Sequence, residues 1–494
     1  MAFLFTAIYA IVFKINGETL LRGIVWFRED LRIHDNTALA NAAKHCTDGI
    51  IALYIIDIPM LKKHHMANCR IDFILRGLSL LKNDLEALHI PFTILKLTKS
   101  DSITANIIKL VHQSQAEALF FNRQYETNEI KRDSQVQTYL NKHSIACYSF
   151  DDTVILPPHS LITQQGSYFK VFTPFKNAWY KKFLADEHRL LPALKPQKPI
   201  PFKSSDITFE LNEFRSTIDP NLWPSGERSA KRKLNTFIKH HLFSYDKNRD
   251  FPANDGTSKL SPYLSAGMIS PRACFLKAFD ANQQELNTGN KGVIAWMIEL
   301  IWRDFYKHLL VFEPKLSMHR AFQAETEKII WAYDEKKFIA WQTGNTGIPI
   351  VDAAMRQLNT TGWMHNRLRM IVAMFFSKNL FFDWRLGEDY FIRHLIDGDL
   401  AANNGGWQWS ASTGTDAAPY FRIFNPIRQS ERFDPEGIFI RKYCPELNDF
   451  DNHAIHAPFD RMPLLAKNTS YPKPIVNLEL SRKHAIAAFA KLRH

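Results

Sequence analysis

Asp397-Gly398-Asp399-Leu400-Ala401-Ala402-Asn403-Asn404-Gly405-Gly406-Trp407-Gln408-Trp409 is the stretch of this sequence with the densest chemistry. It combines two acids, two adjacent amides, a Gly-Gly pair and two tryptophans with little aliphatic surface. A core helix would not carry this much polarity. Acids and amides can hydrogen-bond the edge of a flat polar ring system, while tryptophans supply stacking surface and can pass single electrons. Taken alone, the Asn-Gly dipeptide is equally typical of a surface turn.

The composition indicates a large, basic, aromatic-rich protein. The chain has 494 residues, of which 46% are hydrophobic and 13% aromatic, so we expect two to four domains with a large core. There are 62 Lys and Arg against 50 Asp and Glu, and the isoelectric point is about 9.3. This balance favours a polyanionic partner, with nucleic acid first, although charge alone fits any basic enzyme equally well.

The cysteines and the N-terminus exclude several classes of protein. The five cysteines lie far apart and form no C-x-x-C pair, so zinc ribbons and dithiol chemistry are not expected. Their odd number argues against a disulfide framework and for a reducing compartment. The apolar run 2–13 is too short to span a membrane and lacks a basic region before it. We interpret residues 1–22 as a loosely ordered extension.

Residues 23–155 alternate between strand and helix patterns. Short apolar runs predict strands at 23–27, 49–57, 92–97, 118–122 and 146–150. Helical spacing separates them at 37–44, 71–88, 103–112 and 128–141. This alternation predicts an α/β domain with a doubly wound parallel sheet. No Gly-rich loop follows the first strand, so a nicotinamide-dinucleotide site is not expected there.

The rest of the chain predicts a linker and an all-helical domain. Eight prolines punctuate residues 151–222, which predicts an interdomain linker at 156–222 that crosses the surface. From Trp223 onward strand patterns vanish and helical periodicity dominates. We therefore expect a helical domain at 223–480, followed by a short C-terminal end at 481–494.

Three segments of the helical domain carry polar side chains in suggestive patterns. Thr257 and Ser258 are expected to open a helix, whose N-terminus suits a phosphate or a plain N-cap. Glu299, Trp302 and Arg303 lie at i, i+3 and i+4 on one helix face. That face fits either a lined cavity or an amphipathic edge with one salt bridge.

The third segment, 362–370, gives a second polar face. Asn366 and Met370 project together at i, i+4, while Arg367 and Arg369 point elsewhere, toward a phosphate or an acid such as Asp397. With Arg356, Lys378 and Arg385 they form a basic region interleaved with aromatic residues, which is typical of nucleic-acid binding. A solvated charged face is the alternative.

Six segments match, in order, those of one known family. They are Val25-Trp26-Phe27-Arg28-Glu29-Asp30-Leu31-Arg32, Lys170-Val171-Phe172-Thr173-Pro174-Phe175, and residues 256–261, 362–370, 397–409 and 421–426. Together they resemble the photolyase/cryptochrome family, most of all its bacterial class I cyclobutane pyrimidine dimer photolyases. The resemblance runs from about residue 23 to 473. It implies an N-terminal α/β domain and a C-terminal helical domain that holds FAD in a U-shape.

The resemblance also implies which residues serve the flavin. Asn403 matches the residue that faces flavin N5, where an amide can donate or accept without a permanent charge. Trp407, Trp384 and Trp331 match the electron-transfer chain, although each could equally be core packing. The positions that match flavin contacts are Tyr245, Thr257, Ser258, Lys259, Leu260, Ser261, Arg303, Arg369, Asp397, Gly398, Asp399 and Asn403.

The implied activity is light-driven DNA repair by a bacterial cytoplasmic enzyme that associates with the nucleoid when bound to DNA. Its partner is UV-damaged DNA, single- or double-stranded, bound by a monomer that does not read base sequence. The damaged dinucleotide is flipped into a cavity, and excited reduced FAD donates one electron to it. The residues that match this site are Arg249, Glu299, Trp302, Arg303, Asn366, Arg367, Met370, Trp409 and Arg422.

An antenna cofactor is expected between the domains. Relatives that use 5,10-methenyltetrahydrofolate contact it at the positions of Asn128 and Glu129, which equally suit an ordinary helix start. They usually offer a lysine where this chain has Met318. A thioether cannot pair with an acidic group, so we expect folate to bind weakly.

Three alternatives remain beside this reading. A cryptochrome-type photoreceptor without repair activity usually carries a C-terminal tail, and this sequence ends at His494. Enzymes that repair the six-four photoproduct carry His at the positions of Asn366 and Met370, to move protons. A generic flavin oxidoreductase would need a motif for a nicotinamide partner, which this sequence lacks.

Overall fold

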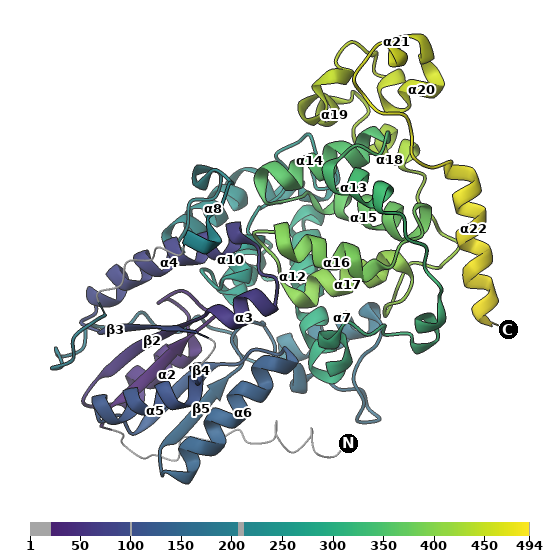
Figure 1. Cartoon of the computed structure of the whole chain (residues 1–494). Helices are drawn as coiled ribbons and strands as arrows, with labels where there is room; N and C mark the ends of the chain where they lie inside the picture. Colours follow the sequence, from purple (N-terminus) through teal and green to yellow (C-terminus); the bar gives the residue numbers. More distant parts are fainter. Residues whose placement is uncertain (1–20, 99–100, 206–211, 494) are drawn as a thin grey trace.

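The computed structural model describes residues 21–98, 101–205 and 212–493. The extension predicted at 1–22 therefore lies almost wholly outside the described residues. Two bodies are evident in Figure 1: a sheet with its covering helices at the lower left, and a helical domain above and to the right. No helix within the described ranges combines the length and apolarity needed to cross a membrane.

The five predicted strands form one parallel sheet. They are β1 (Gly23–Phe27), β2 (Ile50–Asp57), β3 (Phe92–Leu97), β4 (Ala118–Asn122) and β5 (Ala146–Phe150), in the order β3-β2-β1-β4-β5. In the centre, Val25 pairs with Ala52 on one side and Phe120 on the other. All five residues of β1 are buried, as expected for a parallel strand with helices on both faces. The doubly wound fold is confirmed.

The helices of this domain lie close to their predicted positions. The side chain of Asn36 caps the first of them by accepting from the backbone N–H of Leu39 at 3.1 Å. The short helix α3 was not predicted, because its six residues are too few to show a period. These helices are α2 (Thr37–His45), α3 (Ile58–Lys63), α4 (Asn68–Glu86), α5 (Ile103–Ser114) and α6 (Thr127–Lys142).

The prediction that the linker simply crosses the surface is wrong for its middle part. That part forms α7 (Phe172–Ala185), which buries Phe172, Phe175, Trp179 and Phe183. These aromatic residues recur at helical spacing, but the many prolines around them concealed the pattern. The linker is therefore partly a piece of the core.

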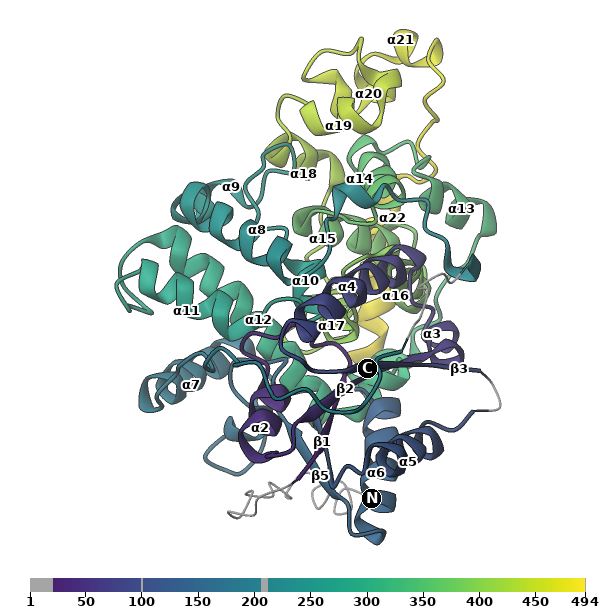
Figure 2. The same cartoon turned by 90° about the vertical axis from the view of Figure 1, so that its left-hand side faces the viewer.

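The helical domain contains no strand in its described residues, 223–493, beyond one bridge between Ala332 and Phe382. Its longest helix is α12 (Lys291–Phe312), whose N-cap Asn290 accepts from the N–H groups of Gly292 and Val293. Near the centre of Figure 2, α12 lies beside α17, and the two helices are in contact. The other helices are α8 (Glu227–His240), α9 (Tyr245–Asn248), α10 (Ser261–Ser265), α11 (Pro271–Ala281), α13 (Glu335–Thr343), α14 (Pro349–Thr361), α15 (Asn366–Met374), α16 (Trp384–His394), α17 (Leu400–Ala411), α18 (Pro426–Phe433), α19 (Ile438–Tyr443), α20 (Pro458–Arg461), α21 (Pro463–Lys467) and α22 (Leu478–Ala490).

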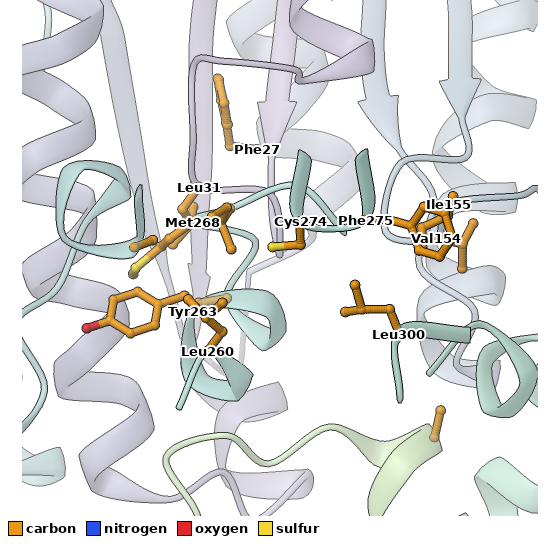
Figure 3. Packing of buried hydrophobic residues seen from close by; sticks show 14 of the residues in the cluster. Phe27, Leu31, Val154, Ile155, Leu260, Tyr263, Met268, Cys274, Phe275 and Leu300 are labelled. Atoms are coloured by element: carbon orange, nitrogen blue, oxygen red, sulfur yellow. The ribbon is translucent and has the colours of Figure 1, made fainter. Parts of the chain in front are cut away.

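The two domains share one hydrophobic core. Figure 3 shows Phe27 and Leu31 of the α/β domain in the same cluster as Met268 and Leu300 of the helical domain. Gly267 sits where they meet, with φ +64°, and a Cβ there would come within 2.0 Å of the Glu29 carbonyl oxygen. Only glycine tolerates both constraints.

Ion pairs add to this junction. Arg272 of the helical domain binds Asp35 at 3.1 Å and Asp152 at 2.9 Å. The Asp152 side chain is completely buried, and Arg32 also pairs with it at 2.5 Å. Because these charges are paired within the protein, the relative placement of the two domains is fixed by polar geometry as well as by packing.

Candidate functional site

Asp397 and Asp399, at the start of the motif 397–409, are each paired with a basic side chain. Arg369 donates to both carboxylate oxygens of Asp397, at 3.0 and 2.7 Å, as predicted for that pair. Asp399 accepts from the N–H of Ala402 at 3.0 Å and so caps α17. Lys307 of α12 binds the same carboxylate at 2.8 Å. Although burial alone would raise the pKa of Asp399, Lys307 and Arg303 lower it below its usual range.

Two turns of α17 present an amide beside open space. The Nδ2 of Asn403 donates to the carbonyl oxygen of Glu388 at 3.0 Å, which leaves its Oδ1 available as an acceptor. Gly406 is one turn further on the same face, and beyond its chain neighbours and the backbone of its own helix no atom lies within 4 Å of where its Cβ would stand. A flat ring therefore has room next to an amide that can hydrogen-bond its edge.

Glu388 was not singled out from the sequence, although it organises this amide pair. Its side chain is fully buried, accepts from Asn404 at 2.9 Å and pairs with His319 at 2.9 Å. The hydrogen bond to Glu388 raises the pKa of His319. A single acid among many on amphipathic helices gives no signal in the sequence.

The loop before α10 differs from its prediction. Thr257 and Ser258 do not open a helix, because α10 begins only at Ser261. Lys259 has φ +49°, a left-handed conformation that a right-handed helix cannot contain. Lys259 pairs with Asp255 at 2.6 Å. The two hydroxyls therefore lie in an ordered loop, where they remain candidates for contact with a phosphate or ribose.

The face predicted on α12 exists, but its members have separate partners. Glu299 binds Arg249 at 2.6 Å. The Trp302 ring stacks on Phe172 of α7, with centroids 3.5 Å apart. Arg303 donates to the carbonyl oxygens of Thr153 and Leu264, which fits a role beside a cofactor better than one at an exposed phosphate. Burial raises the pKa of Glu299, and Arg249 opposes that rise.

The second predicted face, on α15, is accessible. Asn366 is exposed and Met370 is half-buried, so both can meet a ligand. Arg367 pairs with Asp250 at 2.9 Å and lies over the ring of Phe433. Three further candidates are also placed: Tyr245 is buried, Trp409 is half-buried and Arg422 is exposed.

The predicted basic region is wrong for Lys378. This side chain is completely buried, its Nζ lies 3.5 Å from the centroid of Phe489, and burial lowers its pKa far below the usual value. Arg356 and Arg385 are engaged by Glu446 and Glu327. Their positions in the sequence could not reveal these partners, which lie 90 and 58 residues away.

The three predicted tryptophans differ in exposure. Trp407 and Trp384 are buried, and Trp331 is half-buried against Phe381. Gly387 is required beside Trp407, because a Cβ there would lie 2.1 Å from the indole. A fourth tryptophan, Trp341, was missed; it is fully buried, with its ring centroid 6.2 Å from that of Trp407.

The predicted antenna residues lie at the domain boundary. The Nδ2 of Asn128 is 3.0 Å from Nε2 of His64, and Glu129 lies 3.5 Å from the same imidazole. The Oε2 of Glu129 is buried without a hydrogen-bond partner among the described residues, and burial raises its pKa. Across the boundary, Met318 is 55% exposed. His64 was missed by the sequence analysis.

A buried ion triad joins this boundary to α17. Besides Asp399, the Nζ of Lys307 lies 3.8 Å from Glu126, the residue before α6. Burial raises the pKa of Glu126 to about 7, although Lys307 opposes the rise. Neither residue was predicted, yet a lysine inside the apolar run of α12 is a usable signal, since buried lysines need partners.

Two family models match this chain. Residues 23–198 match the family described as DNA photolyase, and residues 296–491 match the FAD binding domain of DNA photolyase. The chain is 44% identical over 474 residues to the deoxyribodipyrimidine photo-lyase of Escherichia coli (strain K12), covering 95% of this chain and 98% of that protein.

Solved structures share the whole architecture. An archaeal photolyase from Sulfolobus tokodaii with two FAD molecules superposes with a TM-score of 0.80 at 30% identity, covering 95% of this chain and all of the other. A cryptochrome from Synechocystis sp. PCC6803 superposes with a TM-score of 0.83 at 26% identity, covering 95% and 99% of the two chains.

Proposed function

Because this chain belongs to the photolyase/cryptochrome family, we propose that it is a light-driven enzyme that splits cyclobutane pyrimidine dimers in DNA. One observation carries the proposal. The contact between α12 and α17 runs through Tyr306, whose ring a Cβ on Gly405 would meet at 2.2 Å and which packs on Trp302 with centroids 5.7 Å apart. This supports a dimer site at Trp302 that lies close to the helix bearing Asn403, Trp407 and Trp409.

FAD is the cofactor of the C-terminal domain in this family, and the residues here fit it. Asp397 and Asp399 are each held by a cation, and open space lies beside Asn403 at Gly406. When bound in its reduced form, FAD absorbs light and supplies one electron to the dimer. The Oδ1 of Asn403 would accept from a protonated ring nitrogen beside it, as the reduced flavin offers.

The DNA site is assembled from the end of α9, from α12, α15 and α17, and from the loop after α17. Trp302 and Trp409 pack against the flipped dimer, Glu299 and Asn366 hydrogen-bond its base edges, and Met370 fills the floor. Flipping costs a few kcal/mol, and less for a lesion that stacks poorly. The flanking phosphates are held by Arg249, Arg367 and Arg422.

These phosphate contacts carry no sequence information. The proposed enzyme therefore acts on damaged single- or double-stranded DNA without sequence preference, and we propose that it does so as a monomer. The net charge of +12 supports this mode of binding, because most of the affinity for undamaged DNA comes from phosphate neutralisation.

Trp407, Trp384 and Trp331 form the route by which oxidised flavin is reduced from the surface. Burial supports Trp331 as the outer member, since it alone of the three is partly open to an external reductant.

The boundary site holds an antenna, which we assign to methenyltetrahydrofolate. The unpartnered Oε2 of Glu129 suits the donor edge of a pterin, and Asn128 and His64 lie beside it. The second FAD named for the Sulfolobus tokodaii photolyase is the competing occupant.

The deciding experiment is a repair assay with an oligonucleotide that contains one thymine dimer. We expect restoration of intact thymines under near-ultraviolet or blue light by the reduced protein, and none in the dark. A flavin-loaded protein that binds the dimer but never repairs it would instead be a cryptochrome-type photoreceptor. Repair of a six-four photoproduct but not of the dimer would also overturn the proposal.

A further inference from the structure

The linker motif Lys170–Phe175 has no role in the proposed function, yet it makes the closest ring contact in the described residues. The centroids of Phe172 and Trp302 are 3.5 Å apart, and the two planes differ by only 6°. Phe172 is 7% exposed, whereas Trp302 is half-buried. Phe172 therefore covers one face of the indole without reaching the surface itself.

A stack in which two aromatic rings overlap face to face is not the arrangement that the rings themselves favour. Aromatic pairs prefer offset or edge-to-face arrangements, because the ring quadrupoles repel when two faces overlap fully. The pair that Phe172 forms with Phe305 follows that preference, because the two rings meet edge-on with an interplanar angle of 71°. The overlap with Trp302 must therefore be imposed by the surroundings of the two rings.

Those surroundings hold the motif from two sides. The backbone N–H of Phe172 donates to Asp416 at 3.1 Å, and the hydroxyl of Thr415 donates to the carbonyl oxygen of Lys170. Both partners lie in the loop after α17, just beyond Trp409. On the other side, Phe175 packs against Phe305 of α12 with centroids 5.1 Å apart.

We propose that Phe172 is a positioning residue of the dimer site, which fixes the plane of Trp302 and ties it to the segment that carries Trp409. This inference rests on the proposed contact between Trp302 and the dimer. With one face covered by Phe172, Trp302 offers the flipped bases a surface of fixed orientation. The linker thereby contributes to recognition of the lesion, not only to connection of the domains.

The test uses the full-length, flavin-loaded protein and compares Phe172→Leu with a matched control. Phe183→Leu is that control, because Phe183 lies on the same helix, is also buried, and stacks on Trp179 at 5.0 Å and 8°. Fluorescence anisotropy gives the affinity for an oligonucleotide with one thymine dimer and for the same oligonucleotide undamaged. Flavin absorbance and thermal unfolding report the integrity of each variant.

We expect Phe172→Leu to weaken binding of the dimer about tenfold, the lower range for loss of one base stack, and to leave affinity for undamaged DNA unchanged. Phe172→Tyr should restore the affinity, because it keeps the ring. If Phe172→Leu does not fold, Phe172→Met replaces it, since methionine fills the volume without a ring plane.

A change in dimer affinity no larger than that of Phe183→Leu would overturn the inference. Trp302→Ala separates this failure from failure of the proposed function. If Trp302→Ala loses dimer affinity and Phe172→Leu does not, the positioning role of Phe172 is wrong and the proposed function still stands. If neither variant loses affinity, the proposed contact of Trp302 with the dimer is wrong, and so is the inference that depends on it.

Discussion

At the scale of single residues, Glu299 and Trp302 are the side chains that we propose bind the lesion. Arg249 already holds Glu299 in the free protein, so the carboxylate is oriented before DNA arrives. Trp302 is likewise fixed by Phe172. A site whose groups are ordered in advance loses less entropy on binding.

We predict that Trp302→Ala and Glu299→Ala weaken binding of dimer-containing DNA while FAD stays bound. Loss of the stacked aromatic should cost about 1–3 kcal/mol. Anisotropy titrations measure the affinity, and flavin absorbance after gel filtration measures cofactor retention. Leu464→Ala, on a side chain that is 79% exposed, serves as the control. Equal affinity of either variant and the parent would remove that residue from the site.

Trp331 is the one member of the tryptophan set that is partly open to solvent. We predict that Trp331→Phe slows or stops photoreduction of oxidised FAD by an external thiol, because phenylalanine is much harder to oxidise. Repair by chemically pre-reduced protein should be unchanged. Trp341→Phe is a useful companion, since Trp341 also borders Trp407. Undiminished photoreduction in Trp331→Phe would show that electrons enter by another route.

At the scale of elements, α12 shows what sequence reasoning can and cannot supply. Its 3.6-residue period predicted that Glu299, Trp302 and Arg303 share one side of the helix. The period could not reveal that Lys307 pairs with Glu126 and Asp399, because those acids are 181 and 92 residues away. Periodicity reports which face a residue is on, whereas partners depend on tertiary packing.

The triad makes stability depend on pH in a specific direction. Burial raises the pKa of Glu126 to about 7, so the folded protein binds this proton more tightly than the unfolded chain does. The resulting stabilisation is complete below the ordinary pKa of 4.5 and is lost as the pH rises to about 7. Above that window the contribution is constant.

We therefore predict that Glu126→Gln, which cannot titrate, gains stability relative to the parent between pH 4.5 and 7. Chemical unfolding at half-unit pH steps measures the difference in midpoint. Glu479→Gln is the control, because Glu479 is an exposed helix residue whose pKa is lowered by Lys483 and so lies outside this window. Parallel pH curves for Glu126→Gln and the parent would show that Glu126 does not titrate there.

At the scale of the whole molecule, the sequence predicted the fold class of each domain but not the contacts that join the two domains. Alternating strand and helix patterns predicted the sheet, and apolar periodicity predicted the helical domain. The shared core depends on close approaches such as Gly267 against Glu29, which no local pattern encodes. The aromatic face of α7 does recur at helical spacing, but its partners on α12 and α11 appear only in the structure.

At the domain boundary, the resemblance to folate-using photolyases predicts a lysine where this chain has Met318. A charge-assisted contact to folate would contribute about 1.5–3 kcal/mol if buried. Met318 is 55% exposed, so the expected value falls to about 1 kcal/mol, the upper range for an exposed ion pair. We predict that the protein binds methenyltetrahydrofolate weakly and loses it on purification.

The decisive comparison is Met318→Lys against Ile330→Lys, which adds the same charge at a site that is 92% exposed and outside the proposed antenna residues. Titration of the near-ultraviolet absorption of bound folate gives the affinity of each protein. Met318→Lys should bind about fivefold more tightly than the parent, the gain expected for one exposed ion pair. Ile330→Lys should match the parent, and Glu129→Ala should bind less, because it removes the unpartnered acceptor. Equal gains at both positions would mean that net charge, not a local contact, draws the folate in. Absence of folate binding in every variant, with uptake of a second FAD instead, would reassign the site to a flavin antenna.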